Sequence, residues 1–370
     1  MVNSPPLPPR RLSGGCLLTG LLVASVFVNL VLCGALFYPT SSTEEENAIE
    51  MHMYGNKSEA NKIAVIKAEG ALVEGLDTHI LSQIETAAKD DSVKAVVLRV
   101  ASPGGTIGSS EEIHRELTRL KSGQHPRHPG RTAKPIIASM GSIAASGGYY
   151  IAMPASKVYA EKGTLTGSIG VYAALPNAAG LAKEYGVKLE LIKAGGIKGS
   201  GSPFHNMTPE ERQPWQDMVD QAYDQFLDVV VQGRPKLTKD QLRSEGVMKK
   251  MADIRDEKGN VVKDAKQIEV VRFRADGGSF TAGEAKNLGL IDDIGLLEDA
   301  VTAAATAAGV NEYRVVTYKR QPTVLGMLFG IKAKADAPDL ESISNGLTPR
   351  LWYMAPGSEL SGIVAASGKR

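Results

Sequence analysis

The chain has 370 residues, enough to bury a sizeable core in one or two domains, and its 43% hydrophobic and 22% charged residues are typical of globular proteins. Its net charge of +1 and the lack of a long basic stripe exclude the strong positive field that attracts nucleic acid. The two cysteines both lie near the N-terminus, so the rest of the chain cannot form a disulfide. Composition therefore predicts a globular protein that does not bind nucleic acid.

Residues 12–38 are expected to be a transmembrane anchor. They contain an uncharged apolar run of about the length that spans a bilayer. A cleaved signal peptide is the alternative, but its apolar core is normally shorter. Arg10 and Arg11 precede the run, and cationic flanks stay in the cytoplasm. We therefore expect 1–11 to be a cytoplasmic tail, 39–60 a polar linker, and the rest of the chain to lie outside the inner membrane.

Residues 61–320 alternate between β-branched runs and helical patterns. This alternation is typical of an α/β domain with a largely parallel sheet. Strands are expected over 62–70, 94–105, 134–142, 156–172 and 188–196. Helices are expected over 109–120, 144–153 and 177–186. Residues 321–370 are expected to be a C-terminal tail.

The clearest helix is expected to begin after Thr208. Thr208 and Glu211 fit a capping box, and Pro209 suits the first helical position. Pro214 is expected to kink the first turns. An apolar stripe then recurs at helical spacing, and we expect it to face the core: Trp215, Met218, Val219, Ala222, Phe226 and Val230.

Ser146 is a candidate nucleophile, because it lies between small residues at an expected strand-to-helix turn in the run AASGGYY. A nucleophilic serine needs a base, and no histidine lies close by in the sequence. A Ser-His-Asp triad stays open, because its members are adjacent only in space. His114 lies on a polar helical segment and is expected to be exposed. His125 and His128 resemble a metal-binding pair but lack an acidic or Cys ligand beside them, so no metal site is predicted.

Lysine is the other possible base. A lysine ordinarily holds its proton at neutral pH, but desolvation can lower a lysine pKa by roughly 3–5 units. Lys198 is the lone charge in a Gly-rich stretch just beyond an expected strand. Lys193, nearer that strand, is the rival. Both are also consistent with ordinary surface lysines.

The run SPGG (Ser102–Gly105) follows another expected strand. Pro103 fixes its entry, and the two glycines allow the backbone to approach a substrate closely. Backbone N–H groups at such a turn can stabilise an oxyanion. Taken alone, the run is more typical of an ordinary tight turn.

Several runs, in this order, resemble signal peptide peptidase A, the membrane-bound bacterial serine peptidase family S49 that is also called protease IV. They are VASPGGTIGSSEEIHREL, PIIASMGSIAASGGYYIAM, GTLTGSIGVY, IKGSGSPFHNMTPEER and FTAGEAKNLGLIDDIG. The resemblance covers about residues 62–320. It implies a Clp protease/crotonase-like α/β fold with repeated ββα units, a serine–lysine dyad and no cofactor.

The resemblance also implies the roles of individual residues. Ser146 matches the family nucleophile, and Lys198 matches the general base. Ser168 matches a hydroxyl that orients the lysine. Gly105 and Gly147 match the backbone donors that hold the oxyanion.

The implied function is a membrane-anchored endopeptidase that degrades cleaved signal peptides and other unfolded apolar peptides. Long members of the family carry two tandem copies, with serine and lysine in different copies, whereas this chain carries one. We therefore expect a ring-like homo-oligomer that completes the dyad between neighbouring subunits. The link at 121–133, an insertion near 248–278 and the stretch after 320 depart from the family pattern. Two other classes stay open: a catalytically silent scaffold or chaperone, and a crotonase-type acyl-CoA enzyme.

Overall fold

The computed structural model describes residues 48–124, 126, 128–252, 268–320 and 351–355, together with the helical positions Leu22, Ser25 and Val26. The expected cytoplasmic tail and all other positions of the expected anchor lie outside the described residues. None of the helices within these ranges is long and apolar enough to cross a bilayer. The chain divides into the units Met1–Glu45 and Glu46–Arg370, and the description below concerns the second unit.

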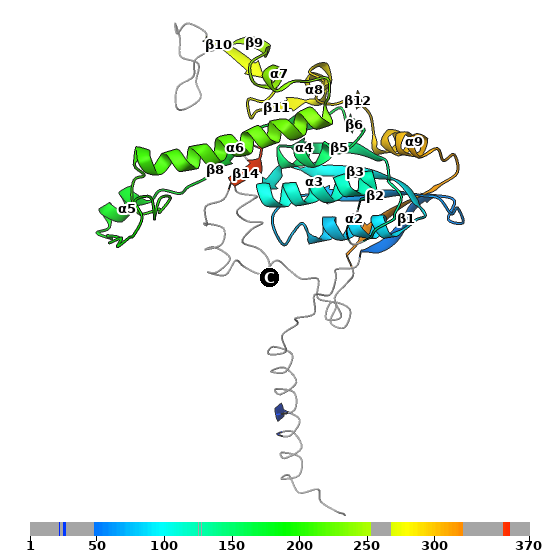
Figure 1. Cartoon of the computed structure of the whole chain (residues 1–370), viewed down its shortest axis with the longest axis horizontal. Helices are drawn as coiled ribbons and strands as arrows, with labels where there is room; N and C mark the ends of the chain where they lie inside the picture. Colours follow the sequence, from blue (N-terminus) through cyan, green and yellow to red (C-terminus); the bar gives the residue numbers. More distant parts are fainter. Residues whose placement is uncertain are drawn as a thin grey trace, which may run out of the picture. The chain divides into compact units, whose positions relative to one another are not determined.

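A nine-stranded sheet lies at the centre of the described residues (Figure 1). Its strands are β1 (Ile49–Gly55), β2 (Lys62–Glu69), β3 (Val93–Ser102), β5 (Ile136–Ala145), β6 (Lys157–Ala160), β7 (Leu165–Gly167), β11 (Ser279–Thr281), β12 (Asp293–Ile294) and β13 (Arg314–Lys319). Their order is β1-β13-β2-β3-β5-β6-β12, with β7 paired to the end of β5 and β11 paired to β7. Strands from β13 to β12 run parallel to their neighbours, whereas β1 and β11 are antiparallel. The predicted α/β class is confirmed.

Helices cover both faces of this sheet (Figure 1). The described helices are α2 (Thr78–Lys89), α3 (Ile107–Ser122), α4 (Gly147–Ala152), α5 (Ala179–Glu184), α6 (Pro209–Gly233), α7 (Lys239–Arg243), α8 (Ala282–Asn287) and α9 (Leu297–Ala308). Ile66 and Leu98 face the core that includes α2, α3, α4 and α6. Ile63 and Val97 face the core that includes α9. Successive side chains of a strand point to opposite faces, so burial of both faces produces the continuous apolar runs of the sequence.

Two small sheets accompany the main one. One has the order β4-β14-β8, formed by β4 (Gly104–Thr106), β14 (Leu351–Met354) and β8 (Tyr172–Ala173). The other pairs β9 (Gly246–Ala252) with β10 (Ile268–Phe273) in antiparallel fashion. The expected insertion near 248–278 therefore contains much of a two-stranded sheet, and its residues 253–267 lie outside the described part.

Helix α6 begins as the sequence predicts, with a complete capping box between Thr208 and Glu211 and a proline at its start. It continues through Pro214 as one helix to Gly233. Its expected core stripe is only half confirmed. Ala222, Phe226 and Val230 are buried, but Met218 is 41% exposed. The amino-terminal half of α6 therefore extends beyond the core that its other half covers.

Two expectations about strands are wrong. Residues 188–196 form no strand, because none of the described strands pairs with them, and Ile192 is 99% exposed. The expected linker contains β1, in which Ile49, Met51 and Met53 alternate with polar residues and which pairs with β13 through the backbone. In addition, the helix expected from 144 begins at Gly147, since β5 extends to Ala145.

Replacement of Phe226 by alanine should destabilise the fold. Phe226 is fully buried where α6 packs against α4, so Phe226→Ala leaves a cavity that costs about 3–5 kcal/mol. Met218→Ala on the exposed part of the same helix should change the free energy of unfolding by less than about 0.5 kcal/mol. Chemical denaturation followed by circular dichroism measures both values. Equal losses in the two variants would contradict this placement of α6.

Candidate active site

Ser146 is the single residue between β5 and α4. Its backbone has φ 55° and ψ −117°, a conformation that residues other than glycine rarely adopt. Such strain is concentrated at functional sites, and a sharp strand-to-helix turn is the usual support of a nucleophilic serine. Its side chain is fully buried, and its Oγ has no hydrogen-bond partner among the described residues. A buried hydroxyl without a partner requires an explanation, which a reacting ligand would provide.

Ser168, which the resemblance matches to a lysine-orienting hydroxyl, lies beside Ser146. The parallel register pairs Ala145 with Gly167, so the two serines follow adjacent positions of neighbouring strands. Ser168 also has a positive φ, of 52°, and its Oγ donates to the Gly277 carbonyl at 3.0 Å. The Ser146 N–H donates to the Gly167 carbonyl at 2.8 Å, which ties the two turns together.

The two predicted oxyanion donors also meet beside Ser146. A Cβ added to Gly147 would lie 3.1 Å from the Gly105 nitrogen and 2.5 Å from Ser110 Oγ. A Cβ added to Gly105 would lie 1.7 Å from the Leu72 carbonyl oxygen. Only glycine fits at either position, and the close approach brings the two backbone amides together.

A segment of the chain that the sequence analysis assigned to the tail lies at these amides. Strand β14 pairs with β4 in antiparallel register, with Tyr353 opposite Gly105. The Ala355 N–H donates to the Pro103 carbonyl at 2.8 Å, and hydrogen-bonded pairs alternate along an antiparallel ladder. Tyr353 and Gly105 therefore form the next such pair, in which the Gly105 N–H faces the Tyr353 carbonyl.

The Tyr353 carbonyl is also close to the second donor. A Cβ added to Gly104 would lie 2.0 Å from the Tyr353 oxygen and 2.7 Å from the Gly147 nitrogen, so these two atoms flank one point. A peptide carbonyl thus lies at the two amides that the resemblance implies hold the oxyanion. The signal in the sequence was the short aromatic and apolar run LWYM, which is typical of a strand but gives no partner.

The Tyr353 side chain fills an aromatic pocket. Its ring stacks on Tyr150 at 5.2 Å between centroids and contacts Phe226 at 4.7 Å. Its hydroxyl donates to the Ala222 carbonyl of α6 at 2.9 Å. Trp352 and Met354 point to the opposite face, where they contact a cluster with Val73, Leu76 and Tyr172. The segment therefore binds as an extended peptide with apolar pockets on both sides.

His114 differs from the expectation of an exposed side chain. It is half-buried, and its ring meets Tyr150 edge-on at 5.1 Å. Burial lowers the pKa of His114 to about 4, so the ring is neutral at pH 7. The sequence did not predict this contact, because His114 lies in a polar helical pattern and Tyr150 belongs to a different element. His114 supports the pocket of Tyr353 and does not reach Ser146 through any hydrogen bond that the structure records.

Lys198 is not brought to Ser146 within one chain. It is exposed in a Gly-rich turn beside the first half of α6, where Trp215 Nε1 donates to Ser200 Oγ at 3.3 Å. Helix α4, which directly follows Ser146, contacts the second half of α6 through Tyr150 and Phe226. A rise of 1.5 Å per residue separates Trp215 from Phe226 by about 16 Å along the helix. Figure 1 shows α5 lying apart from α4, near the opposite part of α6.

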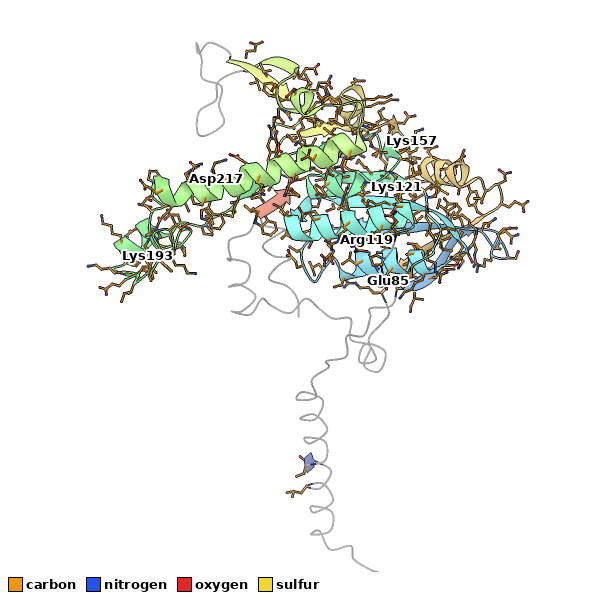
Figure 2. The ribbon with its side chains drawn as sticks, viewed as in Figure 1. Glu85, Arg119, Lys121, Lys157, Lys193 and Asp217 are labelled. Carbon is orange, nitrogen blue, oxygen red and sulfur yellow. The ribbon has the colours of Figure 1, made fainter. Side chains whose placement is uncertain are left out.

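Lys193, the rival base, is part of an ion cluster at the start of α6. Its Nζ lies 3.1 Å from Glu211 Oε1, and His205 Nε2 lies 3.0 Å from Glu211 Oε2. Hydrogen bonds from His205, Thr208 and Lys193 lower the pKa of Glu211 to about 2. Figure 2 shows Lys193 in the segment that carries α5, away from the sheet. This cluster holds the segment that contains Lys193 and Lys198 against the start of α6.

The one histidine of the 121–133 link that the structure describes is paired with a carboxylate. His128 Nε2 lies 3.2 Å from Glu85 Oε1, and His125 lies outside the described residues. Among the described residues, no group of three or more His, Cys, Asp or Glu side chains could hold a metal ion.

Comparison with known proteins identifies the family. The model of Peptidase family S49 matches residues 130–251. A protein of Synechocystis sp., called a protease only provisionally in its name, is 33% identical over 258 residues, which cover 70% of this chain and 78% of that protein. The chain belongs to peptidase family S49. The resemblance to signal peptide peptidase A is thereby confirmed.

Other relatives place this S49 chain among proteins of different lengths. Protease 4 of Salmonella typhi is 31% identical over 299 residues, which cover 78% of this chain but only 42% of the Salmonella protein. An Enterococcus faecium protein, named provisionally as signal peptide peptidase SppA, is 29% identical, with 82% of this chain and 83% of that protein covered.

Among solved structures, a ClpP1 point mutant from Listeria monocytogenes aligns with a TM-score of 0.37 and 11% identity, covering 64% of this chain and 94% of that chain. This likeness is too distant to support an argument. The Clp protease/crotonase type of the α/β fold therefore stays a prediction for this S49 chain.

A methyl group at Gly105 should disrupt the site. Gly105→Ala places its Cβ against the Leu72 carbonyl, so β4 must shift, at a cost of about 1–3 kcal/mol and with loss of activity. Gly163→Ala is the matched control, since nothing lies within 4 Å of the added Cβ. Thermal unfolding and peptide hydrolysis measure both effects. A stable and active Gly105→Ala variant would show that the two amides are not held by this close contact.

Proposed function

We propose that this chain is a membrane-anchored serine endopeptidase with Ser146 as nucleophile and Lys198 as general base. The observation that carries the proposal is the segment Leu351–Ala355, an extended peptide with one carbonyl at the glycine amides beside a strained serine without a hydrogen-bond partner. A peptide substrate bound in the same way would present its scissile carbonyl to Ser146. In the chain's own segment, the equivalent bond is Tyr353–Met354.

The chemistry follows from these positions. Neutral Lys198 removes the proton from Ser146 Oγ, and the oxygen attacks the scissile carbonyl. The N–H groups of Gly105 and Gly147 stabilise the tetrahedral oxyanion, each contributing about 3–4 kcal/mol. Ser168 orients the lysine, which then gives its proton to the leaving amine. Water, activated by the same lysine, releases the acyl-enzyme and restores the serine.

The groove favours apolar substrates in an extended conformation. Tyr353 lies in an aromatic pocket, and Trp352 and Met354 are nearly fully buried on the other face. Main-chain pairing with β4 and β8 supplies affinity for any sequence, while the pockets supply preference. Cleaved signal peptides and other unfolded apolar segments have the required chemistry. We place their degradation outside the cytoplasmic membrane, with the N-terminus of the chain in the cytoplasm.

We further propose that the dyad is completed between neighbouring subunits of a ring-like homo-oligomer. Lys198 lies beside the first half of α6, too far from the second half to reach Ser146 of its own chain. Its side chain is exposed. The segment around it displays apolar side chains to solvent, including Tyr185 at 74% and Ile192 at 99% exposure. An exposed apolar patch of this kind is typical of an interface. A second copy would cover the patch, exclude water from Lys198, and supply the serine.

Removal of the Ser146 hydroxyl should abolish peptide hydrolysis without unfolding the chain. Ser146→Ala removes one oxygen atom and leaves the backbone turn in place, so stability should change by about 1 kcal/mol or less. A fluorophosphonate probe should label the wild-type chain and not this variant. A scaffold or chaperone would label in neither form, and an acyl-CoA enzyme would bind coenzyme A. Hydrolysis by Ser146→Ala at a near-normal rate would contradict the assignment.

A mixture of Ser146→Ala and Lys198→Ala subunits should regain activity that neither has alone. In a randomly mixed ring, about a quarter of the interfaces combine an intact serine with an intact lysine, so about a quarter of wild-type activity should return. Energy transfer between labelled subunits confirms exchange. The control replaces the Lys198→Ala partner with a double variant that lacks both groups. Full exchange without activity would place both residues of the dyad in one chain.

A further inference from the structure

A cavity beside α6 lies on the path that a longer peptide would follow. It has a volume of about 510 Å³, and its walls include Leu175, Met207, Trp215 and Val219. The sequence predicted Trp215 and Val219 as core residues, but both are only half-buried and line this cavity. Both side chains are therefore partly accessible from this cavity, although Trp215 also donates to Ser200.

The register of β14 leads toward this cavity. Leu351 pairs with Ala173 and Trp352 with Tyr172 in antiparallel fashion. If Tyr353 holds the scissile carbonyl, its position is P1 and that of Leu351 is P3. Continuing the same register, a residue at P4 would lie opposite Ala174, and one at P5 would lie opposite Leu175, a wall of the cavity.

The side-chain direction agrees with the register. Side chains at P1, P3 and P5 share one face of a strand, and the P1 side chain contacts Ala222 and Phe226 of α6. Val219 and Trp215 continue the same helical stripe toward the start of α6. Four residues of strand cover about 13 Å, which falls within the roughly 16 Å from Trp215 to Phe226 along this stripe. Figure 1 shows β14 and β8 lying along α6.

We infer that this cavity is a distal subsite that receives an apolar side chain at P5 of the peptide substrate. The inference rests on the proposed peptidase function and deepens it, because it defines substrates by a position four residues before the cleaved bond. Leu175, Met207, Val219 and the Trp215 ring provide apolar walls. Arg212 and His205 also line the cavity, where they can contact backbone carbonyls of the bound peptide.

The test compares two peptides of equal length that share Leu-Trp-Tyr at P3–P1 and differ only at P5, as leucine or serine. Burial of the leucine side chain should raise kcat/KM by about tenfold over the serine peptide. Val219→Gln should reduce this ratio to about one. Met218→Gln, the adjacent change outside the cavity, should keep it near tenfold. Competition by the chain's own segment acts equally on both peptides, so it cancels in the ratio.

A variant in a second wall of the cavity and a measurement of binding distinguish the possible outcomes. Leu175→Gln, from the loop opposite α6, should also abolish the preference, which guards against misfolding of the helix variant. Binding of fluorescent versions of both peptides to full-length Ser146→Ala reports the P5 preference without catalysis.

Cleavage of both peptides at equal rates would overturn the subsite and leave the peptidase intact. A binding preference without cleavage would support the subsite and contradict the proposed function. A change of oligomeric mass in Val219→Gln would overturn the inference, since it would make the cavity a contact between subunits.

Discussion

The site depends on backbone segments that approach too closely for any side chain. Gly105 lies against the Leu72 carbonyl, and Gly147 lies against both Ser110 and Gly105. Glycine is the residue that permits such contact, at an entropic cost in the unfolded chain. The contact is possible because β3 and β5 are parallel neighbours, so the turns that follow them meet at one edge of the sheet. The donors of the site are therefore rigid backbone groups, and Ser146 is held in a strained turn among them.

Helix α6 connects the region around Ser146 with the segment that carries Lys198. Its second half is buried against α4, while its first half carries the segment with Lys198 through the Trp215–Ser200 bond and the Glu211 cluster. A straight helix fixes the distance between its ends, so the serine and the lysine of one chain are held apart rather than together. The same rigidity would hold the lysine in a defined position for a neighbouring subunit. If these two residues form the dyad, as we propose, their separation within one chain favours its completion by assembly.

The sequence predicted what local patterns determine. The strand-to-helix turn at Ser146, the glycine run at Gly105 and the capping box of α6 each depend on residues a few positions apart, and the structure has all three elements where expected. What it could not predict depends on pairing between distant segments. Strand β14 has a partner more than two hundred residues away, and β1 lies in a stretch expected to be a linker yet pairs with β13. Conversely, residues 188–196 have an apolar strand pattern without any strand beside them.

The burial of Ser146 beneath the chain's own segment sets the condition that a substrate must meet. Tyr353 is fully buried and hydrogen-bonded to α6, so a peptide can reach the serine only after this segment leaves. Because the segment belongs to the same chain, its effective concentration does not fall on dilution, whereas the concentration of a free substrate does. Short peptides that offer only the contacts of Leu351–Ala355 therefore compete poorly. Under the proposed function, longer apolar peptides would gain further strand pairing and side-chain burial upstream of the cleaved bond, and each such contact would shift the competition toward them.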